Sequence, residues 1–256
     1  MNLSGEFPIL EFDPNKQAFI EPCKLIKPID IAARCIICFF KEVVDRLAND
    51  GKLRGIAELR CECGIIPIYE MELQGEKIAI FNPLIGAPSA AALLEEVIAL
   101  GCSKFIACGG AGVLKKDLVV GHLIIPVSAI RDEGTSYHYL PPAREVYTNA
   151  HAVKTIKNVL NRHGVKYLTA KTWTTDAFYR ETPEKVELRK SEGCVTVEME
   201  CSALSAVSQF KGVIFGQILY DGDDLSGNEW DGRKWIDRKD IRESIFRLAV
   251  ECCMEL

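Results

Sequence analysis

The sequence predicts an α/β domain with three layers, in which a mixed central sheet is flanked by helices on both faces. Two observations predict this fold. Strand-like and helix-like segments alternate along the chain, with short turn signals between them. The chain has 256 residues, of which 48% are hydrophobic, and this is enough to bury a sheet on both sides. No repeat, linker or low-complexity tract interrupts the pattern, so we expect a single domain over residues 1–256.

The elements are assigned in order from their spacing and their end signals. A helix is expected over 86–101, because Pro88 lies near its start and Gly101 at its end. The run FIACGG (105–110) predicts a strand that gives way to a loop at its glycines. The other expected elements are strands at 52–75, 77–84, 122–130, 165–174, 194–200 and 212–220, and helices at 148–164, 183–193, 201–212 and 237–256.

Composition excludes several classes of partner. Lysine and arginine number 31 against 36 aspartates and glutamates, which gives a net charge of −5, so neither nucleic acid nor an anionic membrane surface is an expected partner. The longest apolar runs reach about 8 residues, whereas a membrane span needs roughly 18. The N-terminus MNLSGEFPIL lacks the basic and apolar regions of a signal peptide. We therefore expect a cytoplasmic protein that binds small solutes.

The 11 cysteines are expected to be reduced thiols in the core, because most of them lie in apolar stretches. Cys35 and Cys38 have the C-x-x-C spacing of a metal-binding pair, but they lie in an apolar run that we expect to be helical. A zinc site needs four ligands with loop geometry around them. We therefore expect no metal site.

Ligands of open α/β sheets bind beyond the carboxyl ends of the strands, and the first such end is FIACGGAGVL (105–114). Backbone amides of glycines can cradle a phosphate. However, no lysine or arginine occurs in 105–114, and neither G-x-G-x-x-G nor G-x-x-x-x-G-K-[ST] matches the glycines. A dinucleotide site or a P-loop nucleotide site is therefore not predicted.

In VEMECSAL (197–204) a predicted strand ends in two carboxylates, Glu198 and Glu200. Alternation along the strand places both on one face and Met199 on the other. Buried carboxylates need hydrogen-bond donors, and the cis-diol of a sugar can donate twice to one carboxylate. Alternatively, one glutamate pairs with an arginine and the other caps the helix that starts near Cys201. The residues alone leave both interpretations open.

YDGDDL (220–225) places Asp221, Asp223 and Asp224 just after an apolar strand. Crowded carboxylates raise one another's pKa, so one of them can stay protonated and serve as a general acid. The alternative is a solvated Asp-Gly turn.

Two other strand ends offer weaker signals. In TTDAFYRET (174–182) a flat ligand can stack on Phe178, although such an aromatic residue is commonly a packing residue. The polar segment 131–142 contains Ser136 and His138, but no G-x-S-x-G motif occurs anywhere in the chain. A serine hydrolase triad is therefore not predicted.

Taken together, the motifs resemble the nucleoside phosphorylase superfamily, the branch that holds the uridine phosphorylases, the hexameric purine nucleoside phosphorylases and the methylthioadenosine/adenosylhomocysteine nucleosidases. The likeness runs from about Leu73 to about Leu225, and VEMECSAL is its most specific part. In family order the motifs are GAPSAAALLEEVIALG, CGGAGVL, VGHLIIPVSAIRDEGTSYHY, TTDAFY, VEMECSAL and ILYDGDDL. The resemblance implies the family's fold and N-glycosidic bond cleavage without a cofactor.

The resemblance also implies roles for the sugar-binding residues. Glu200 matches the glutamate that holds the ribose 2′ and 3′ hydroxyls, and Met199 matches the methionine beside the sugar. Glu198 matches the first glutamate of the motif, near the base and the sugar. Gly109 and Gly110 match the loop beneath the glycosidic bond.

On the base side, Phe178 matches the aromatic residue that packs against the base or the ribose. Asp223 matches the aspartate that protonates a leaving purine at N7. The match has a physical rationale, because cleavage leaves an oxocarbenium-like sugar and an anionic base that a general acid can neutralise.

The chain departs from the family at the phosphate site. Phosphorolytic relatives usually carry an arginine where this chain has Ala107, and the phosphate arginine from a neighbouring subunit falls near Gly64. The family's G-D-P-x-R motif has only a loose counterpart, which ends at Arg34. If phosphate binds, we expect Arg34 or Arg131 to hold it together with amides of the glycine loop.

Three hypotheses follow. The first is a phosphorylase that converts a nucleoside and phosphate to the free base and (deoxy)ribose 1-phosphate. The second is an N-ribosyl hydrolase that uses water, which explains the missing arginines more directly. The third is a non-catalytic nucleoside-binding protein. We favour the first, and the resemblance implies a homodimer or a hexamer built from dimers.

Overall fold

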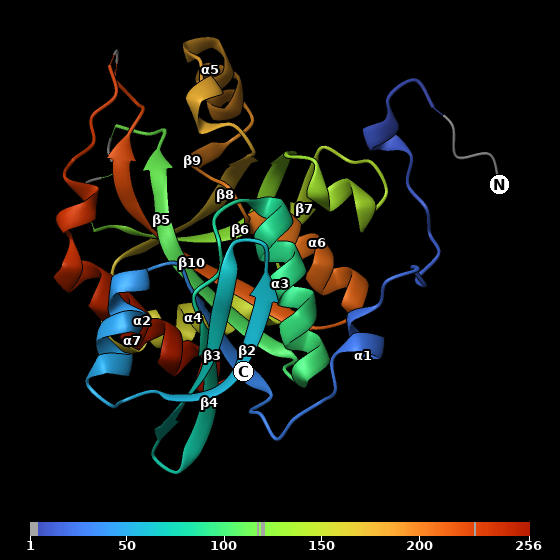
Figure 1. The fold of residues 1–256 in the computed structure, drawn as a ribbon. Helices are drawn as coiled ribbons and strands as arrows, with labels where there is room; N and C mark the ends of the chain where they lie inside the picture. Colours follow the sequence, from blue (N-terminus) through green and yellow to red (C-terminus); the bar gives the residue numbers. More distant parts are fainter. Residues whose placement is uncertain (1–4, 117, 119–120, 228) are drawn as a thin grey trace.

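The computed structural model describes residues 5–116, 118, 121–227 and 229–256. It confirms an α/β fold in which helices cover both faces of a mixed central sheet (Figure 1). The strands are β1 (Arg34–Cys38), β2 (Arg54–Cys61), β3 (Gly64–Leu73), β4 (Glu76–Phe81), β5 (Lys104–Val113), β6 (Leu123–Asp132), β7 (Glu145–Tyr147), β8 (Tyr167–Thr175), β9 (Cys194–Glu198) and β10 (Ile214–Asp224). The helices are α1 (Pro22–Leu25), α2 (Lys41–Asn49), α3 (Ala87–Leu100), α4 (Ala150–Arg162), α5 (Pro183–Ser191), α6 (Cys201–Lys211) and α7 (Lys239–Met254). Short 3-10 turns are η1 (Pro8–Leu10), η2 (Thr135–His138), η3 (Phe178–Arg180) and η4 (Trp235–Asp237).

Strand β5 is the centre of the sheet. It pairs in parallel with β1 and β10, and its last residues pair antiparallel with β9. Because β10 continues through β6 and β8 back to β9, these five strands close into a ring. From the other side of β5, strands β1, β4, β3 and β2 extend as an open sheet. The mixed sheet was predicted from the sequence, but its closure was not.

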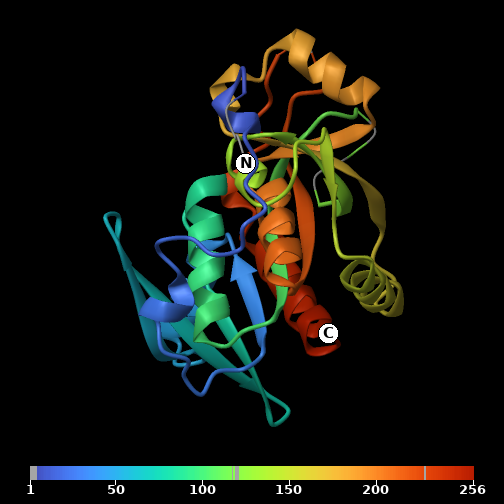
Figure 2. The same ribbon diagram turned by 90° about the vertical axis from the view of Figure 1, so that its right-hand side faces the viewer.

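Helices α2, α4 and α7 pack on one face of the sheet, and α3 and α6 pack on the other (Figures 1 and 2). Strand β1 shows why: Ile36 and Cys38 belong to the first core cluster, whereas Cys35 and Ile37 belong to the second. The predicted helix at Cys35–Cys38 was therefore wrong. A strand buried on both faces is a continuous apolar run, which periodicity cannot distinguish from a buried helix. The two thiols face opposite layers, so they cannot share a metal ion.

The glycines of FIACGGAGVL do not begin a loop, because β5 continues as a strand to Val113. Gly112 shows why glycine is needed there. A Cβ at this position would lie 2.6 Å from Leu225 Cδ1 and 3.0 Å from Val197 Cγ1. The absence of a side chain lets Leu225 and Val197 pack directly over the backbone of β5 at this position.

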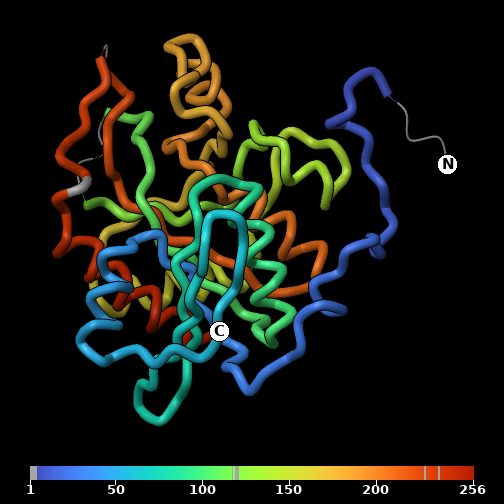
Figure 3. Tube along the Cα trace, viewed as in Figure 1, coloured from blue at the N-terminus to red at the C-terminus, as the bar shows by residue number. Residues whose placement is uncertain are grey.

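The expected strand at 52–75 is in fact two strands, β2 and β3, which form a hairpin. In Figure 3 the Cα trace shows this hairpin and the β3–β4 hairpin as two long, narrow loops. The first turn passes through Gly64, whose φ of +119° strains any other residue. The missed signal was Cys63-Gly64, a turn between two apolar segments.

The segment before β1 runs along the outside of the domain, over α3 and η2 (Figure 2). It has little regular structure and exposes several large apolar side chains, among them Phe19 and Ile20. Across the described residues, no helix is both long and apolar enough to cross a bilayer.

Candidate active site

The strand ends that carry Glu198, Gly112 and Asp223 come together where β5, β8, β9 and β10 meet. Thr174 near the end of β8 pairs with Glu198 at the end of β9. Val197 pairs with Gly112 of β5, and β5 pairs with the end of β10. A Cβ on Gly112 would lie 3.4 Å from Asp223 Oδ1, so Asp223 also lies at this junction. Closure of the ring therefore brings the VEMECSAL and YDGDDL motifs to one place.

Glu198 is a structural anchor. Its Oε1 accepts a hydrogen bond from Thr174 Oγ1 at 2.6 Å, and its Oε2 accepts from the backbone amides of Glu200 (2.8 Å) and Cys201 (2.7 Å). The carboxylate thus caps the first turn of α6, where the helix dipole also favours a negative charge. This is the capping alternative that the sequence left open, and it belongs to Glu198.

Glu200 differs from Glu198 because most of its acceptor capacity is unused. Its Oε1 accepts from the amide of Gly86 at 2.7 Å, at the start of α3. Gly86 has φ +98°, a conformation that glycine adopts without strain and that other residues rarely adopt. A carboxylate offers about four acceptor positions, so a sugar diol could still bind to this one.

Both glutamates have raised pKa values, but the effects that accompany burial differ between them. Burial raises the pKa of Glu198 to about 7, against the opposing effect of its hydrogen-bond donors. Burial raises the pKa of Glu200 to about 8, and the negative charge of Glu198 adds to this. Strand β9 ends at Glu198 and α6 begins at Cys201, so the side-chain alternation of the strand does not extend to Glu200. The two carboxyls nevertheless remain close enough to interact. Between them, Met199 is half-buried.

A further set of polar groups, which the sequence analysis missed, supports these carboxyls. Ser202 Oγ donates to Glu133 Oε1 at 2.9 Å, and Glu133 Oε2 accepts from the amide of Ser136 at 2.9 Å. The Ser202 amide donates to Thr174 Oγ1, which itself donates to Glu198. The signal was the RDEGTS segment, a set of polar residues directly after an apolar strand.

Arg131 belongs to the same network. Its Nε donates to Ser136 Oγ at 2.8 Å, and its other two nitrogens donate to the carbonyls of Pro141 (2.8 Å) and Leu140 (3.2 Å). The guanidinium also lies over the ring of Tyr137. Arg131 therefore holds the segment after β6 in place, and each of its nitrogens already donates within that segment.

Arg34 lies away from the other candidates. It is the first residue of β1, at the opposite end of the strand from the carboxyl end, where it pairs with Lys104 at the start of β5. Its guanidinium forms an ion pair with Glu76 at 3.2 Å. The structure therefore offers no support for Arg34 as a phosphate ligand.

On the base side, Asp223 Oδ2 accepts a hydrogen bond from Trp230 Nε1 at 2.6 Å. Phe178 lies in η3, is 49% exposed, and packs against Tyr179 with ring centroids 4.1 Å apart. Glu181, one residue past η3, was missed by the sequence analysis. Burial raises its pKa to about 7, and the negative charge of Asp223 adds to the effect, so the two carboxyls are neighbours.

The three aspartates of YDGDDL lie within β10, so the alternative of a solvated turn was wrong. Asp221 is fully buried, its carboxylate oxygens have no hydrogen-bond partner among the described residues, and burial raises its pKa to about 7. Asp224 instead forms an ion pair with Arg233, and its pKa is lowered because hydrogen bonds from Ser226 and the nearby arginine outweigh burial. Each carboxyl therefore has a distinct environment.

Aromatic rings flank Gly109 and Gly110. A Cβ on Gly109 would lie 3.3 Å from the ring of Phe39, and a Cβ on Gly110 would lie 3.1 Å from the ring of Tyr220. Phe39 directly follows β1. Ala107, two residues before Gly109, is fully buried against the core of α3 and α6. Phe39 and Ala107 thus make the surroundings of Gly109 apolar.

Comparison with known proteins agrees with the motifs. Residues 33–242 match the family described as the phosphorylase superfamily. The chain is 28% identical to a guanosine phosphorylase from Halorubrum lacusprofundi over 82% of this chain and 86% of that protein. It is 30% identical to a uridine phosphorylase from Treponema pallidum over 68% and 71% of the two chains. Its fold matches a crystal structure of uridine phosphorylase from Vibrio fischeri with a TM-score of 0.77, at 24% identity over 92% and 97% of the chains.

Proposed function

The chain belongs to the phosphorylase superfamily, and from this premise we propose that it cleaves the N-glycosidic bond of a nucleoside with phosphate. The products are the free base and ribose 1-phosphate or its deoxy form. Phosphate is a co-substrate, and the reaction requires no other cofactor. The likeness to a guanosine phosphorylase over most of that protein's length supports a nucleoside as the substrate.

The observation that carries the proposal is the pair of unequal glutamates. Glu198 uses both oxygens to bind Thr174 and the start of α6, which fixes the position of Glu200 two residues later. Glu200 is held at one oxygen by the amide of Gly86 and retains capacity for a diol. Such an acceptor, buried and already oriented, is suited to hold the ribose while the glycosidic bond stretches.

We assign Asp223 as the general acid for the leaving base. It lies at the same junction as Val197, the neighbour of Glu198, and Trp230 fixes the direction of its carboxyl. Phe178 supplies a ring for the base to pack against, and Met199 lies between the glutamates at the sugar. Protonation at N7 is available only in a purine, so this assignment favours purine nucleosides.

Phosphate must approach the sugar from the side opposite the base. The family resemblance implies that Gly109 and Gly110 lie on that side, where the rings of Phe39 and Tyr220 flank them. Each nitrogen of Arg131 donates to its own segment, so its chief role is to hold that segment in place. We therefore expect weak phosphate binding that depends chiefly on backbone amides.

The apolar surroundings of Gly109 favour a second candidate function, hydrolysis of the same bond by water. A dianion without nearby cations loses much of its hydration and regains little, whereas a neutral water molecule loses far less. The sugar and base residues serve both reactions equally, so the two candidates differ only in the nucleophile.

A panel of purine and pyrimidine nucleosides tests both candidates. Release of free base is followed with and without inorganic phosphate, and the sugar product is identified as ribose 1-phosphate or ribose. Phosphate-dependent release of ribose 1-phosphate supports the phosphorylase. Release of ribose that is indifferent to phosphate selects the hydrolase, and binding without any base release selects the non-catalytic nucleoside-binding protein.

We further propose that the protein is a homodimer or a hexamer of dimers, as the family resemblance implies. The exposed apolar side chains before β1 support association with another chain. Light scattering of the purified protein measures the assembly directly, and a monomer would contradict this part of the proposal.

A further inference from the structure

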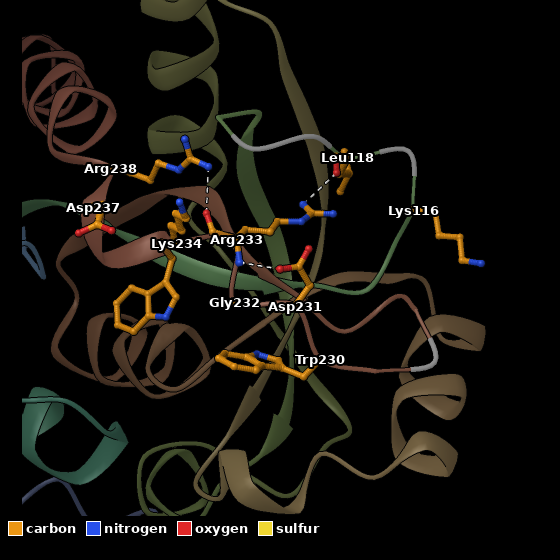
Figure 4. Close-up of a pocket in the computed structure, with 10 residues that line it drawn as sticks. Lys116, Leu118, Trp230, Asp231, Gly232, Arg233, Lys234, Asp237 and Arg238 are labelled. Atoms are coloured by element: carbon orange, nitrogen blue, oxygen red, sulfur yellow. Dashed lines mark hydrogen bonds between the residues drawn. The ribbon is translucent and has the colours of Figure 1, made fainter.

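A large pocket lies beside the candidate site, between the segment after β5 and the segment after β10 (Figure 4). Its volume is about 1130 Å³, which exceeds what one nucleoside needs. None of the residues assigned above to sugar, base or phosphate lines it. One wall is Trp230, whose indole nitrogen donates to Asp223, so the pocket and the candidate acid share this side chain.

The walls combine aromatic and cationic side chains. Trp230 is 64% exposed and Trp235 is 41% exposed, although large aromatic side chains are usually buried. Four cationic residues line the pocket, against two aspartates. This is a local excess of positive charge in a chain whose net charge is −5. The cationic residues are Lys116, Arg233, Lys234 and Arg238.

Several of these cationic side chains have N–H donors that are not used in hydrogen bonds among the described residues. Arg233 is committed to Asp224 and to the carbonyl of Leu118. Arg238, in contrast, donates to the carbonyl of Arg233, and its buried Nε has no partner among the described residues. Within the part of the chain that the structure describes, neither Lys116 nor Lys234 has an ion pair. An anion in this pocket would therefore meet unsatisfied donors.

The backbone that carries two of these cations is strained. Arg233 and Lys234 have φ of +43° and +51°, which non-glycine residues adopt rarely. Two consecutive residues of this kind place their side chains around the pocket. Backbone strain of this type clusters at functional sites, where the strained geometry is part of binding or catalysis.

The arrangement of the walls indicates the shape of the ligand. In Figure 4, Trp230 lies on the opposite side of the pocket from Arg238 and Lys234. A ligand that uses both walls needs a flat ring at one end and an anionic group at the other, with a spacer between them. A nucleotide has this form, since its base can stack on an indole and its phosphate can accept from guanidinium and ammonium groups.

We propose that this pocket is a second site, which binds a nucleoside monophosphate with the base on Trp230 and the phosphate at Lys234 and Arg238. It goes beyond the proposed cleavage reaction and does not depend on it. Trp230 also donates a hydrogen bond to Asp223. A nucleotide bound in this pocket therefore contacts the side chain that orients the candidate acid.

The test is titration with AMP and GMP, followed by tryptophan fluorescence and by calorimetry. It is done in the Glu200→Ala background, which removes the diol contact of the candidate active site. Lys234→Asn removes the charge and retains a residue that tolerates positive φ. We expect it to weaken AMP binding about tenfold, the loss of one charge-assisted contact. Lys239→Ala is the matched control, because this neighbouring exposed lysine does not line the pocket.

Two further results bear on the proposal. Arg238→Ala provides a second variant at the proposed phosphate contact, and it should also weaken binding. Adenosine without the phosphate should bind the Glu200→Ala protein at least about tenfold more weakly than AMP. The proposal is overturned if AMP does not bind in this background, or if Lys234→Asn and Arg238→Ala both leave its affinity within about twofold of the control.

Discussion

The two sides of the candidate site are built very differently. On the β8–β9 side, Glu198 and Glu200 lie in a hydrogen-bond network that reaches through Thr174 and Ser202 to Glu133. On the β1–β5 side, aromatic rings flank the glycines, and Ala107 stands where the family resemblance implies a phosphate arginine. The difference teaches that, under the proposed function, the side that would hold the sugar is rigidly built, whereas the side of the nucleophile offers only backbone amides and neighbouring apolar groups.

Removal of Glu200 tests the sugar side of the candidate site and has the largest expected effect. Glu200→Ala deletes an acceptor of two charge-assisted hydrogen bonds, so we expect kcat/KM to fall about 100-fold or more. Steady-state base release with the best nucleoside of the panel measures the effect. Glu187→Ala, at an exposed position of α5, is the control and should be neutral. A near-normal rate for a folded Glu200→Ala protein would remove the sugar-binding assignment.

Asp223→Asn tests the base side. General acid catalysis contributes about 100-fold to 10,000-fold, and this variant can still accept the hydrogen bond from Trp230. The loss should be greater for purine nucleosides than for pyrimidine nucleosides, because only purines offer N7. Rates for both classes are compared in the same preparation. Equal losses would show that Asp223 does not protonate the base at N7.

The pH dependence of nucleoside binding distinguishes the role of Glu200 from that of Glu198. A diol donates to the ionised form of Glu200, but in the free protein burial raises the pKa of this carboxyl to about 8. Binding below that pH must therefore release a proton, so nucleoside affinity should rise as pH increases toward 8, by up to about tenfold per pH unit. Calorimetry with the slow Asp223→Asn variant measures it. The dependence should vanish in Glu200→Gln, and if it persists there, another group controls it.

The smallest expected effect is on stability, where the two sides join at β5. Gly112→Ala places a Cβ against Leu225 and Val197, so we expect a loss of about 1–3 kcal/mol in the free energy of unfolding. Urea denaturation measures the change. Gly55→Ala is the matched control, since a Cβ there meets no atom within 4 Å. Equal stability of the two variants would mean that the ring closes without the glycine.

Sequence motifs indicated which residue types gather at the candidate site, and whether these residues bind a nucleoside stays a prediction. VEMECSAL indicated a carboxylate for a sugar diol and a helix cap, and the structure assigns the cap to Glu198. Residue type alone could not place the phosphate candidates, because neighbours in space decide the environment of a side chain. Arg131 and Arg34 are cations with suitable charge, yet one is bonded to its own segment and the other lies at the far end of β1. Glu181 could not be selected, because its significance comes from the nearby Asp223.

By itself the sequence determined the α/β class, the order of most helices and strands, and the family to which the motifs belong, because periodicity and local motifs encode these directly. Only the tertiary structure decided that β1 is a strand, that β5 runs on through its glycines, and that five strands close into a ring. These outcomes depend on which surfaces meet in space. The same packing gave Glu198 and Glu200 their different environments, although both lie in one four-residue stretch, VEME.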